Sequence, residues 1–197
     1  MKDFVVLNCF IIRAAQINRE RSEKMDRMDY EKAVNTYATM VYRIAFSYTN
    51  SKYDAEDILQ EVFLKLLQTS TNFSNEEHVK HWLVRVTINQ GKNLHKSFWK
   101  RNVEVSEPGT FELEWKEERE KRLYEELQQL PGKYRVMLHL YYFEGYRTRE
   151  IAEMFHMRAS TVNTRIDRGR KLLRELLEED EKNGCKKNGY ERKGILL

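Results

Sequence analysis

Apolar residues recur at intervals of three and four positions along most of the chain, which limits the folds it can adopt. Such spacing places the apolar side chains on one face of a helix. The segment 30–49 shows the pattern, with apolar residues at Val34, Tyr37, Ala38, Val41, Ile44 and Ala45. Only 2 Pro and 8 Gly occur among 197 residues, too few for a turn-rich all-β fold. The sequence therefore predicts an all-α protein.

Two further helices follow the first and complete a helical domain predicted at 25–100. Asp54 is the expected N-cap of a helix over 54–68. The polar stretch "TSTNFSNE" is the expected loop, and a third helix is predicted over 76–100. The segment 1–24 is expected to be an N-terminal extension, either disordered or upstream of a start at Met25 or Met28.

An acidic segment separates this domain from a second helical domain. The segment 101–120 holds 7 acidic and 3 basic residues and contains "SEPGT", so it is predicted to be a linker with a charge of −4. A helix then ends at "PG", and another stops before Gly145. The second domain is predicted over 121–179, with a flexible tail over 180–197.

The stretch "YRTREIAEMFHMRASTVNTRIDRGRKLL" predicts two helices joined by a three-residue turn. Thr148 is the expected N-cap of the first helix, and residues 156–158 form the turn. Gly169 lies in the apolar stripe of the second helix, where it allows close packing. Thr161 and Asn163 flank the outward face, which carries Ser160, Thr164, Asp167, Arg168 and Lys171. This geometry is typical of a helix-turn-helix, whose second helix enters a DNA major groove. A merely solvated amphipathic helix would show the same pattern, so the pattern alone leaves both interpretations open.

A resemblance to a known family covers most of the chain and favours DNA binding. The pieces "LPGKYR", "GYRTREIA" and "STVNTRIDRGRKLL" resemble region 4 of the sigma-70 family, in its extracytoplasmic-function (ECF) group. The piece "YDAEDILQEVFLKLL" is similar to region 2.2, and "HWLVRVTINQGKNLHKSFWKR" is similar to regions 2.3 and 2.4. Two motif sets in the family's order are far more specific than a lone helix-turn-helix.

The resemblance implies that the second domain recognises the −35 promoter element as double-stranded DNA. Arg149 and Arg170 become candidates for contacts with the DNA backbone, as does Arg165. The implied DNA-binding residues of the recognition helix are Ser160, Thr161, Asn163, Thr164, Arg165, Asp167, Arg168 and Lys171.

The same resemblance assigns the first domain to the −10 element, which the loop 70–77 and the following helix would open and hold as single-stranded DNA. Aromatic surfaces beside positive charge suit unstacked bases. The implied residues are Phe73, Lys80, Arg85, Asn89, Lys92, Lys96, Trp99 and Lys100. Trp82 lies near the apolar stripe and is more typical of a core residue.

Protein partners also follow from the resemblance. The first domain would dock on the β′ coiled coil of core RNA polymerase through Asp57, Gln60, Glu61 and Phe63. The second domain would bind the β flap, and the acidic linker would thread polymerase channels that otherwise handle nucleic acid. An anti-sigma factor is the expected regulatory partner.

Two residues depart from the family pattern. His156 stands where the family usually has Gly in the turn, and Arg158 stands where Ser or Pro usually caps the recognition helix. His156 would need a left-handed backbone. These departures affect the expected entry angle of the recognition helix, and not its existence.

Other classes of function find little support. His78 and His81 have no third ligand nearby in sequence, so no metal site is predicted. We find no phosphate-binding glycine loop or nucleophile motif, and expect neither an enzyme nor a cofactor. Cys9 and Cys185 fit a reducing cytoplasm, and no apolar run approaches the ~20 residues that membrane insertion needs.

Two alternatives remain beside a sigma factor. A helix-turn-helix regulator would bind duplex operator DNA without polymerase, usually as a dimer. A protein-interaction module would use neither Asn163 nor Arg168 on DNA.

Overall fold

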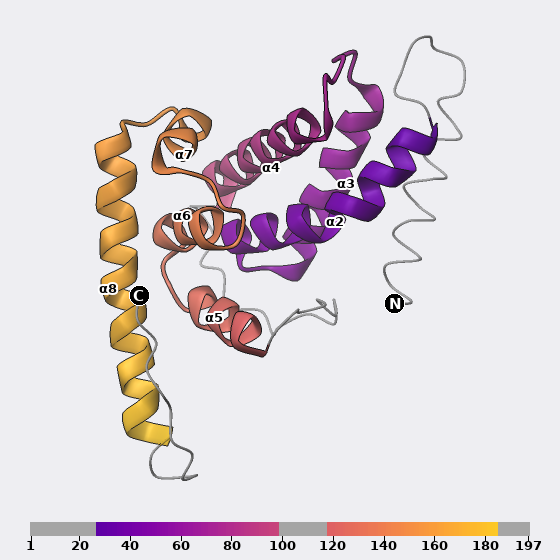
Figure 1. The fold of residues 1–197 in the computed structure, drawn as a ribbon. Coiled ribbons are helices and arrows are strands. Elements are labelled where there is room, and N and C mark those ends of the chain that lie inside the picture. Colours follow the sequence, from indigo (N-terminus) through magenta and orange to yellow (C-terminus); the bar gives the residue numbers. More distant parts are fainter. Residues whose placement is uncertain (1–26, 99–117, 185–197) are drawn as a thin grey trace.

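A computed structural model describes residues 27–98 and 118–184, and their side chains over 30–93 and 118–178. In these ranges the protein consists of helices joined by turns and loops. No strand occurs within these ranges, and the prediction of an all-α fold is confirmed (Figure 1). The helices are α2 (Arg27–Thr49), α3 (Lys52–Gln68), α4 (Glu76–Phe98), α5 (Glu118–Gln128), α6 (Gly132–Tyr142), α7 (Thr148–Phe155) and α8 (Ala159–Gly184).

Helices α2, α3 and α4 form the first helical unit, and each packs against the other two. Asn50, with φ of 54°, ends α2. Ser51 then caps α3, because its hydroxyl accepts a hydrogen bond from the Asp54 backbone N–H at 3.4 Å. The N-cap predicted at Asp54 is therefore wrong by three residues, since Asp54 already lies inside the first turn.

Helices α5 to α8 form the second unit, in which α7 and α8 make the expected helix-turn-helix. Thr148 is the first residue of α7, so the cap position belongs to Arg147, not to Thr148 as predicted. The Arg147 backbone N–H donates to the Glu150 carboxylate at 2.7 Å, which satisfies one amide that the helix leaves unpaired. Long α8 lies along the edge of the molecule (Figure 1).

Two residues position α8: His156 in the turn that precedes it, and Gly169 on its inner face. His156 adopts φ 54° and ψ 47°, the left-handed conformation predicted for it. Gly169 faces α6 closely enough that a Cβ there would lie 2.9 Å from Leu138 Cδ1. The predicted close packing at Gly169 is thus confirmed, and it places α8 directly on α6.

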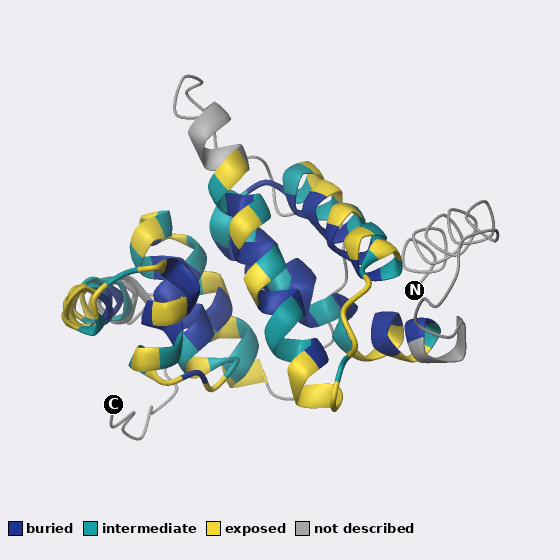
Figure 2. Ribbon diagram, turned by 90° about the horizontal axis from the view of Figure 1, so that it is seen from above, coloured by how far each residue is buried: buried dark blue, intermediate teal, exposed yellow. Residues whose placement is uncertain are grey.

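The two units also pack against each other, mainly through α2 and α6, with a further contact between α4 and α7. Buried residues continue from one unit into the other (Figure 2). No local pattern in the sequence predicted this contact, because its partners lie far apart along the chain. Most of the predicted linker and tail and the whole extension 1–24 lie outside the described residues, although α5 includes 118–120 and α8 continues over 180–184.

Candidate nucleic-acid interface

The outward face of α8 carries most of the side chains predicted to contact the −35 element. Its exposed members are Ser160, Thr161, Asn163, Thr164, Asp167, Arg168 and Lys171. The Thr164 hydroxyl donates to the Ser160 carbonyl at 2.9 Å, and its oxygen can still accept a hydrogen bond. This face thus offers Asn, Arg and hydroxyl groups of the kind that bind base edges and phosphates.

Arg165 and Arg170 do not simply extend from this face into solvent. Arg165 is half-buried and lies toward Tyr48 of α2: burial raises the pKa of Tyr48 to about 12, and the charge of Arg165 opposes that rise. The Arg170 Nε donates to the Tyr142 hydroxyl at 2.8 Å, and its guanidinium lies 3.4 Å from Asp167. Arg149, the third candidate for backbone contacts, is exposed.

The residues predicted to hold the −10 element occupy different environments. Arg85 and Asn89 are exposed on α4. Phe73 is half-buried and packs edge-on against Trp82, with ring centroids 5.8 Å apart, so Trp82 supports the loop from the edge of the core. The side chains of Lys96, Trp99 and Lys100 lie outside the described residues.

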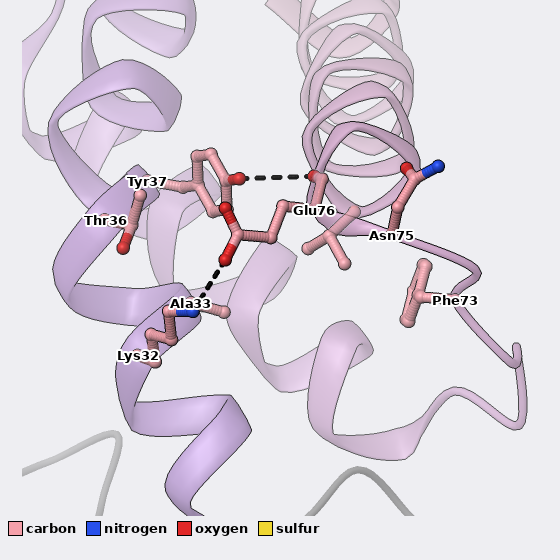
Figure 3. Close-up of a pocket in the computed structure, with 8 residues that line it drawn as sticks. Lys32, Ala33, Thr36, Tyr37, Phe73, Asn75 and Glu76 are labelled. Atoms are coloured by element: carbon pink, nitrogen blue, oxygen red, sulfur yellow. Dashed lines mark hydrogen bonds and ion pairs between the residues drawn. The ribbon is translucent and has the colours of Figure 1, made fainter.

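A pocket of about 230 Å³ opens beside the predicted −10 loop, between α2 and the start of α4 (Figure 3). Lys32 donates to the Glu76 carboxylate at 2.6 Å and thereby lowers the pKa of Glu76. The Tyr37 hydroxyl donates to the Glu76 carbonyl at 3.2 Å. The lining combines the rings of Tyr37 and Phe73 with polar groups of Lys32, Asn75 and Glu76. Lys32 and Tyr37 were not predicted to belong to this site, because they come from α2, far from the loop in sequence.

The predicted polymerase-binding residues lie on α3. Asp57 and Glu61 are exposed, and Gln60 is half-exposed. Phe63 differs from the expectation: it is 0% exposed and packs edge-on against Tyr30, so it supports the helix from inside and offers no surface to a partner. Tyr53 is 75% exposed and lies one turn before Asp57 on the same face. Because Tyr53 precedes Asp57 by four residues, the sequence alone could have placed it on this face of the helix.

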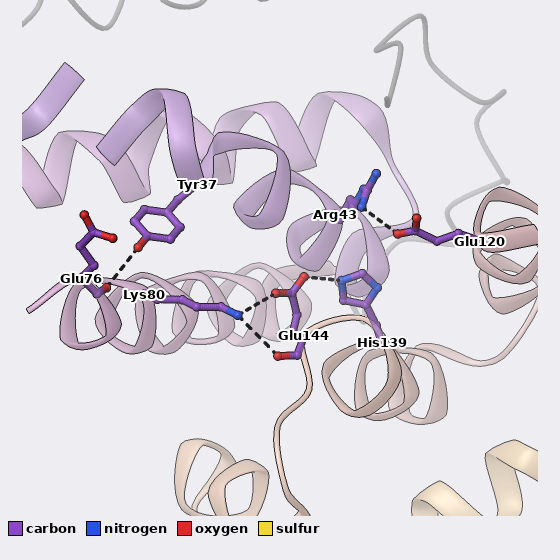
Figure 4. A network of polar contacts seen from close by, with 7 residues as sticks. All are labelled: Tyr37, Arg43, Glu76, Lys80, Glu120, His139 and Glu144. Carbon is purple, nitrogen blue, oxygen red and sulfur yellow. Dashed lines mark hydrogen bonds and ion pairs between the residues drawn. The ribbon is translucent and has the colours of Figure 1, made fainter. Parts of the chain in front are cut away.

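Lys80 and Lys92, two members of the −10 set with described side chains, contact the second unit. Lys80 Nζ lies 3.5 Å from Glu144 Oε2, and Glu144 Oε1 lies 3.6 Å from His139 Nε2 (Figure 4). Burial alone would raise the pKa of Glu144, but His139 and Lys80 together hold it below its ordinary value. Lys92 Nζ donates to the Met154 carbonyl at 3.3 Å.

Family comparisons agree with this geometry over both units. The model for "Sigma-70 region 2" matches residues 33–101, and that for "Sigma-70, region 4" matches residues 120–173. The chain is 34% identical over 142 residues to "RNA polymerase sigma factor SigV" of Bacillus subtilis, covering 71% of this chain and 86% of that relative. The chain belongs to the sigma-70 family, in its ECF group.

A second relative and a solved structure extend the agreement. "ECF RNA polymerase sigma factor SigW" of Bacillus subtilis is 25% identical over 179 residues, covering 80% of this chain and 93% of SigW. The fold is similar to that of the sigma factor RpoE, crystallised with the anti-sigma factor NepR from Bartonella quintana. That likeness has a TM-score of 0.59 at 19% identity and covers 77% of this chain and 98% of RpoE.

Metal sites and membrane-spanning helices are both absent from the described part of the chain. No cluster of three or more His, Cys, Asp or Glu side chains there is suited to a metal ion. Within 27–98 and 118–184, no helix has the length and apolar character needed to cross a bilayer.

Proposed function

We propose that three surfaces of this sigma factor divide the work of promoter recognition. As an ECF sigma factor the chain binds core polymerase, recognises −35 and −10 elements and directs transcription initiation. Sigma factors are initiation factors rather than enzymes. The observation that most strongly supports this proposal is the exposed polar face of α8, which belongs to a helix-turn-helix that matches region 4. The proposed place of action is the cytoplasm, with core polymerase.

The outward face of α8 enters the major groove of the −35 element in this proposal. Asn163 and Arg168 carry side chains able to make paired hydrogen bonds to base edges. Thr161, Thr164 and Lys171 suit phosphate oxygens. Arg149, Arg165 and Arg170 add backbone contacts, with Arg170 oriented by its hydrogen bond to Tyr142.

The pocket beside the loop at 69–75 receives an unstacked base of the −10 element. Extruded bases are held by stacking on rings and by hydrogen bonds to their edges. The pocket offers both through Tyr37, Phe73 and Asn75. The Asn75 Oδ1 already accepts from the His78 backbone N–H at 2.8 Å, which leaves its amide NH₂ as the group for a base. Arg85 and Asn89 lie exposed on the same helix and guide the strand.

The exposed face of α3 docks on the β′ coiled coil of polymerase. Asp57, Gln60 and Glu61 supply polar and acidic contacts, and Tyr53 adds an aromatic anchor of the kind that dominates protein interfaces. The second unit contacts the β flap, and an anti-sigma factor regulates the chain. The crystallised complex of RpoE with NepR supports a partner of that class.

Two variants test the α8 face and the α3 face separately. Both are assayed with core polymerase. Arg168→Ala should lower transcription from promoters that depend on their −35 element by about 10-fold, the loss expected for one paired base contact. Gln60→Ala with Glu61→Ala should instead weaken co-purification with core polymerase. Arg168→Ala should leave the co-purification unchanged, whereas the double variant should lower transcription from all promoters, whether or not they depend on a −35 element.

Two control variants change other exposed residues of the same helices. Arg174→Ala removes an exposed Arg from α8 beyond the predicted contacts, and Lys65→Ala removes an exposed charge from α3. Both controls should behave like the unaltered chain. Full activity of Arg168→Ala together with the double variant would overturn the proposed roles.

A further inference from the structure

Tyr142, the last residue of α6, is an exposed aromatic residue beside the recognition helix. It and Tyr53 are the two large hydrophobic residues that are exposed in the described part of the chain. Tyr53 lies on the α3 face proposed for polymerase, whereas Tyr142 lies against α8. Its hydroxyl accepts a hydrogen bond from Arg170 Nε at 2.8 Å, although its side chain stays 37% exposed. Burial in the core therefore does not account for this tyrosine.

Arg170 is held in a fixed position by its neighbours. Its guanidinium lies 5.3 Å from the centre of the Tyr141 ring and 5.6 Å from that of the Tyr142 ring, which suits a cation over an aromatic face. Its Nη1 lies 3.4 Å from Asp167 Oδ1. An arginine held in this way loses little side-chain freedom when it binds a ligand, and this favours affinity.

The Tyr142 hydroxyl still has a proton to donate. A tyrosine hydroxyl accepts hydrogen bonds and also donates one. Because the Arg170 Nε–H occupies an acceptor position of this oxygen, the hydroxyl proton points to another acceptor, which at this exposed position is solvent or a ligand. An O–H donor therefore lies directly beside a positively charged set of N–H donors. That combination is suited to the oxygens of a phosphate group.

The cluster of Tyr142 and Arg170 adjoins the outward face of α8. Gly169 lets α8 cross α6 closely, and Arg170 follows it directly in sequence. Asp167, whose side chain is 69% exposed, connects Arg170 to the outward face. From 159 to 174, α8 carries five basic residues (165, 168, 170, 171 and 174) and one acidic residue (167). This charge favours a polyanion over a neutral protein surface as the ligand.

We propose that Tyr142 is a DNA-binding residue, whose hydroxyl and the Arg170 guanidinium bind one backbone phosphate of the double-stranded −35 element. The inference rests on the proposed position of α8 in the major groove. The phosphate replaces Asp167 on Arg170 or binds beside it, since an ion pair this exposed is weak. Tyr142 fixes the position of α8 on the duplex and reads no base, because phosphate contacts carry no sequence information directly.

The first experiment measures the affinity of the polymerase holoenzyme for a promoter that the unaltered holoenzyme transcribes, at several salt concentrations. Tyr142→Phe should lower the affinity by about 5-fold, the loss expected for one hydrogen bond, and leave the salt dependence unchanged because the hydroxyl is uncharged. Arg170→Ala should lower the affinity and reduce the logarithmic salt slope by about one. Arg174→Ala, at an exposed position further along α8, is the control and should change neither.

The second experiment identifies the bound phosphate. Single phosphates of the −35 element are replaced by uncharged methylphosphonates, and the affinity of the holoenzyme is measured for each duplex. One replacement should weaken binding by the unaltered holoenzyme and have a smaller effect on both Tyr142→Phe and Arg170→Ala. Replacements elsewhere in the element should affect the three proteins equally.

Three results would overturn the inference. The first is an unchanged affinity of Tyr142→Phe, and the second is a salt slope that falls as far in Tyr142→Phe as in Arg170→Ala, which would show that Tyr142 only orients Arg170. The third is weaker co-purification of Tyr142→Phe with core polymerase, which would assign the residue to a protein partner. Arg168→Ala separates these failures from failure of the proposed function: if it weakens −35 binding while Tyr142→Phe does not, only the role of Tyr142 is wrong.

Discussion

His156 is the residue at which the turn between α7 and α8 departs from ordinary backbone geometry. Its φ of 54° and ψ of 47° lie in the left-handed region, which costs an L-amino acid about 1–2 kcal/mol. The turn is nevertheless held in place, since the His156 N–H donates to the Glu153 carbonyl at 3.1 Å. The turn that precedes the recognition helix is therefore strained at His156.

Glycine at position 156 should relieve this strain. His156→Gly is expected to raise the free energy of unfolding by about 0.5–1 kcal/mol, because the relief exceeds the extra chain entropy that Gly loses. His156→Val should lower it by at least about 1 kcal/mol, since a β-branched residue fits this region poorly. Urea unfolding measures both. A glycine variant less stable than the original chain would contradict the strain.

Local periodicity explains which residues could be placed from the sequence. The outward side chains of α8 follow the helical repeat, whereas the left-handed backbone of His156 was implied by the resemblance, since the family usually has Gly at that position. Phe63 was assigned to the polymerase-binding face through the resemblance, but the packing of α2 on α3 encloses its ring against Tyr30. The partners of Lys80 and Lys92 lie 64 and 62 residues away, beyond the reach of any local pattern.

At the scale of elements, the packing of α8 on α6 positions the recognition helix. Gly169 allows the close approach, with Leu138 and Tyr134 directly opposite. The sequence placed this element well, because the apolar stripe and Gly169 fall on one face. The helix starts were predicted less accurately, since Ser51 and Arg147 occupy the cap positions that were predicted for Asp54 and Thr148.

Enlarging position 169 should therefore push α8 away from α6. Gly169→Val is expected to lower the free energy of unfolding by about 2 kcal/mol or more, since a Cβ alone would lie 3.2 Å from the Tyr134 Cβ. Glu175→Val, at an exposed position on α8, is the control and should cost less than about 1 kcal/mol. Equal effects of the two changes in thermal unfolding would show that the close approach is unimportant.

At the scale of the whole molecule, the two units pack together partly through the largely buried carboxylate of Glu144, whose side chain is 10% exposed. Glu144 faces Lys80 from α4 and His139 from α6, and it lies near Tyr146, whose pKa is raised by burial and by Glu144. The pKa of Glu144 lies below its ordinary value of 4.5. Its ionised form therefore stabilises the folded state above that pH, and this contribution is lost as pH falls through the lowered pKa.

At acid pH, the original chain and the Glu144→Gln variant should therefore have the same free energy of unfolding. Near neutral pH, Glu144→Gln is expected to lower the free energy of unfolding by about 2 kcal/mol, because it weakens hydrogen bonds to a charged group. The difference should shrink as pH falls below 4.5. Urea unfolding at a series of pH values gives the comparison, with Glu153→Gln as control. A difference that stays constant with pH would exclude ionised Glu144 as its source.

Transcription reconstituted from purified bacterial core polymerase, this chain and a pool of genomic promoter fragments tests the central claim most directly. The account predicts discrete transcripts that appear only when both proteins are present, and a shared −35 sequence upstream of their start sites. A chain that bound duplex DNA alone and never directed polymerase to a start site would contradict it.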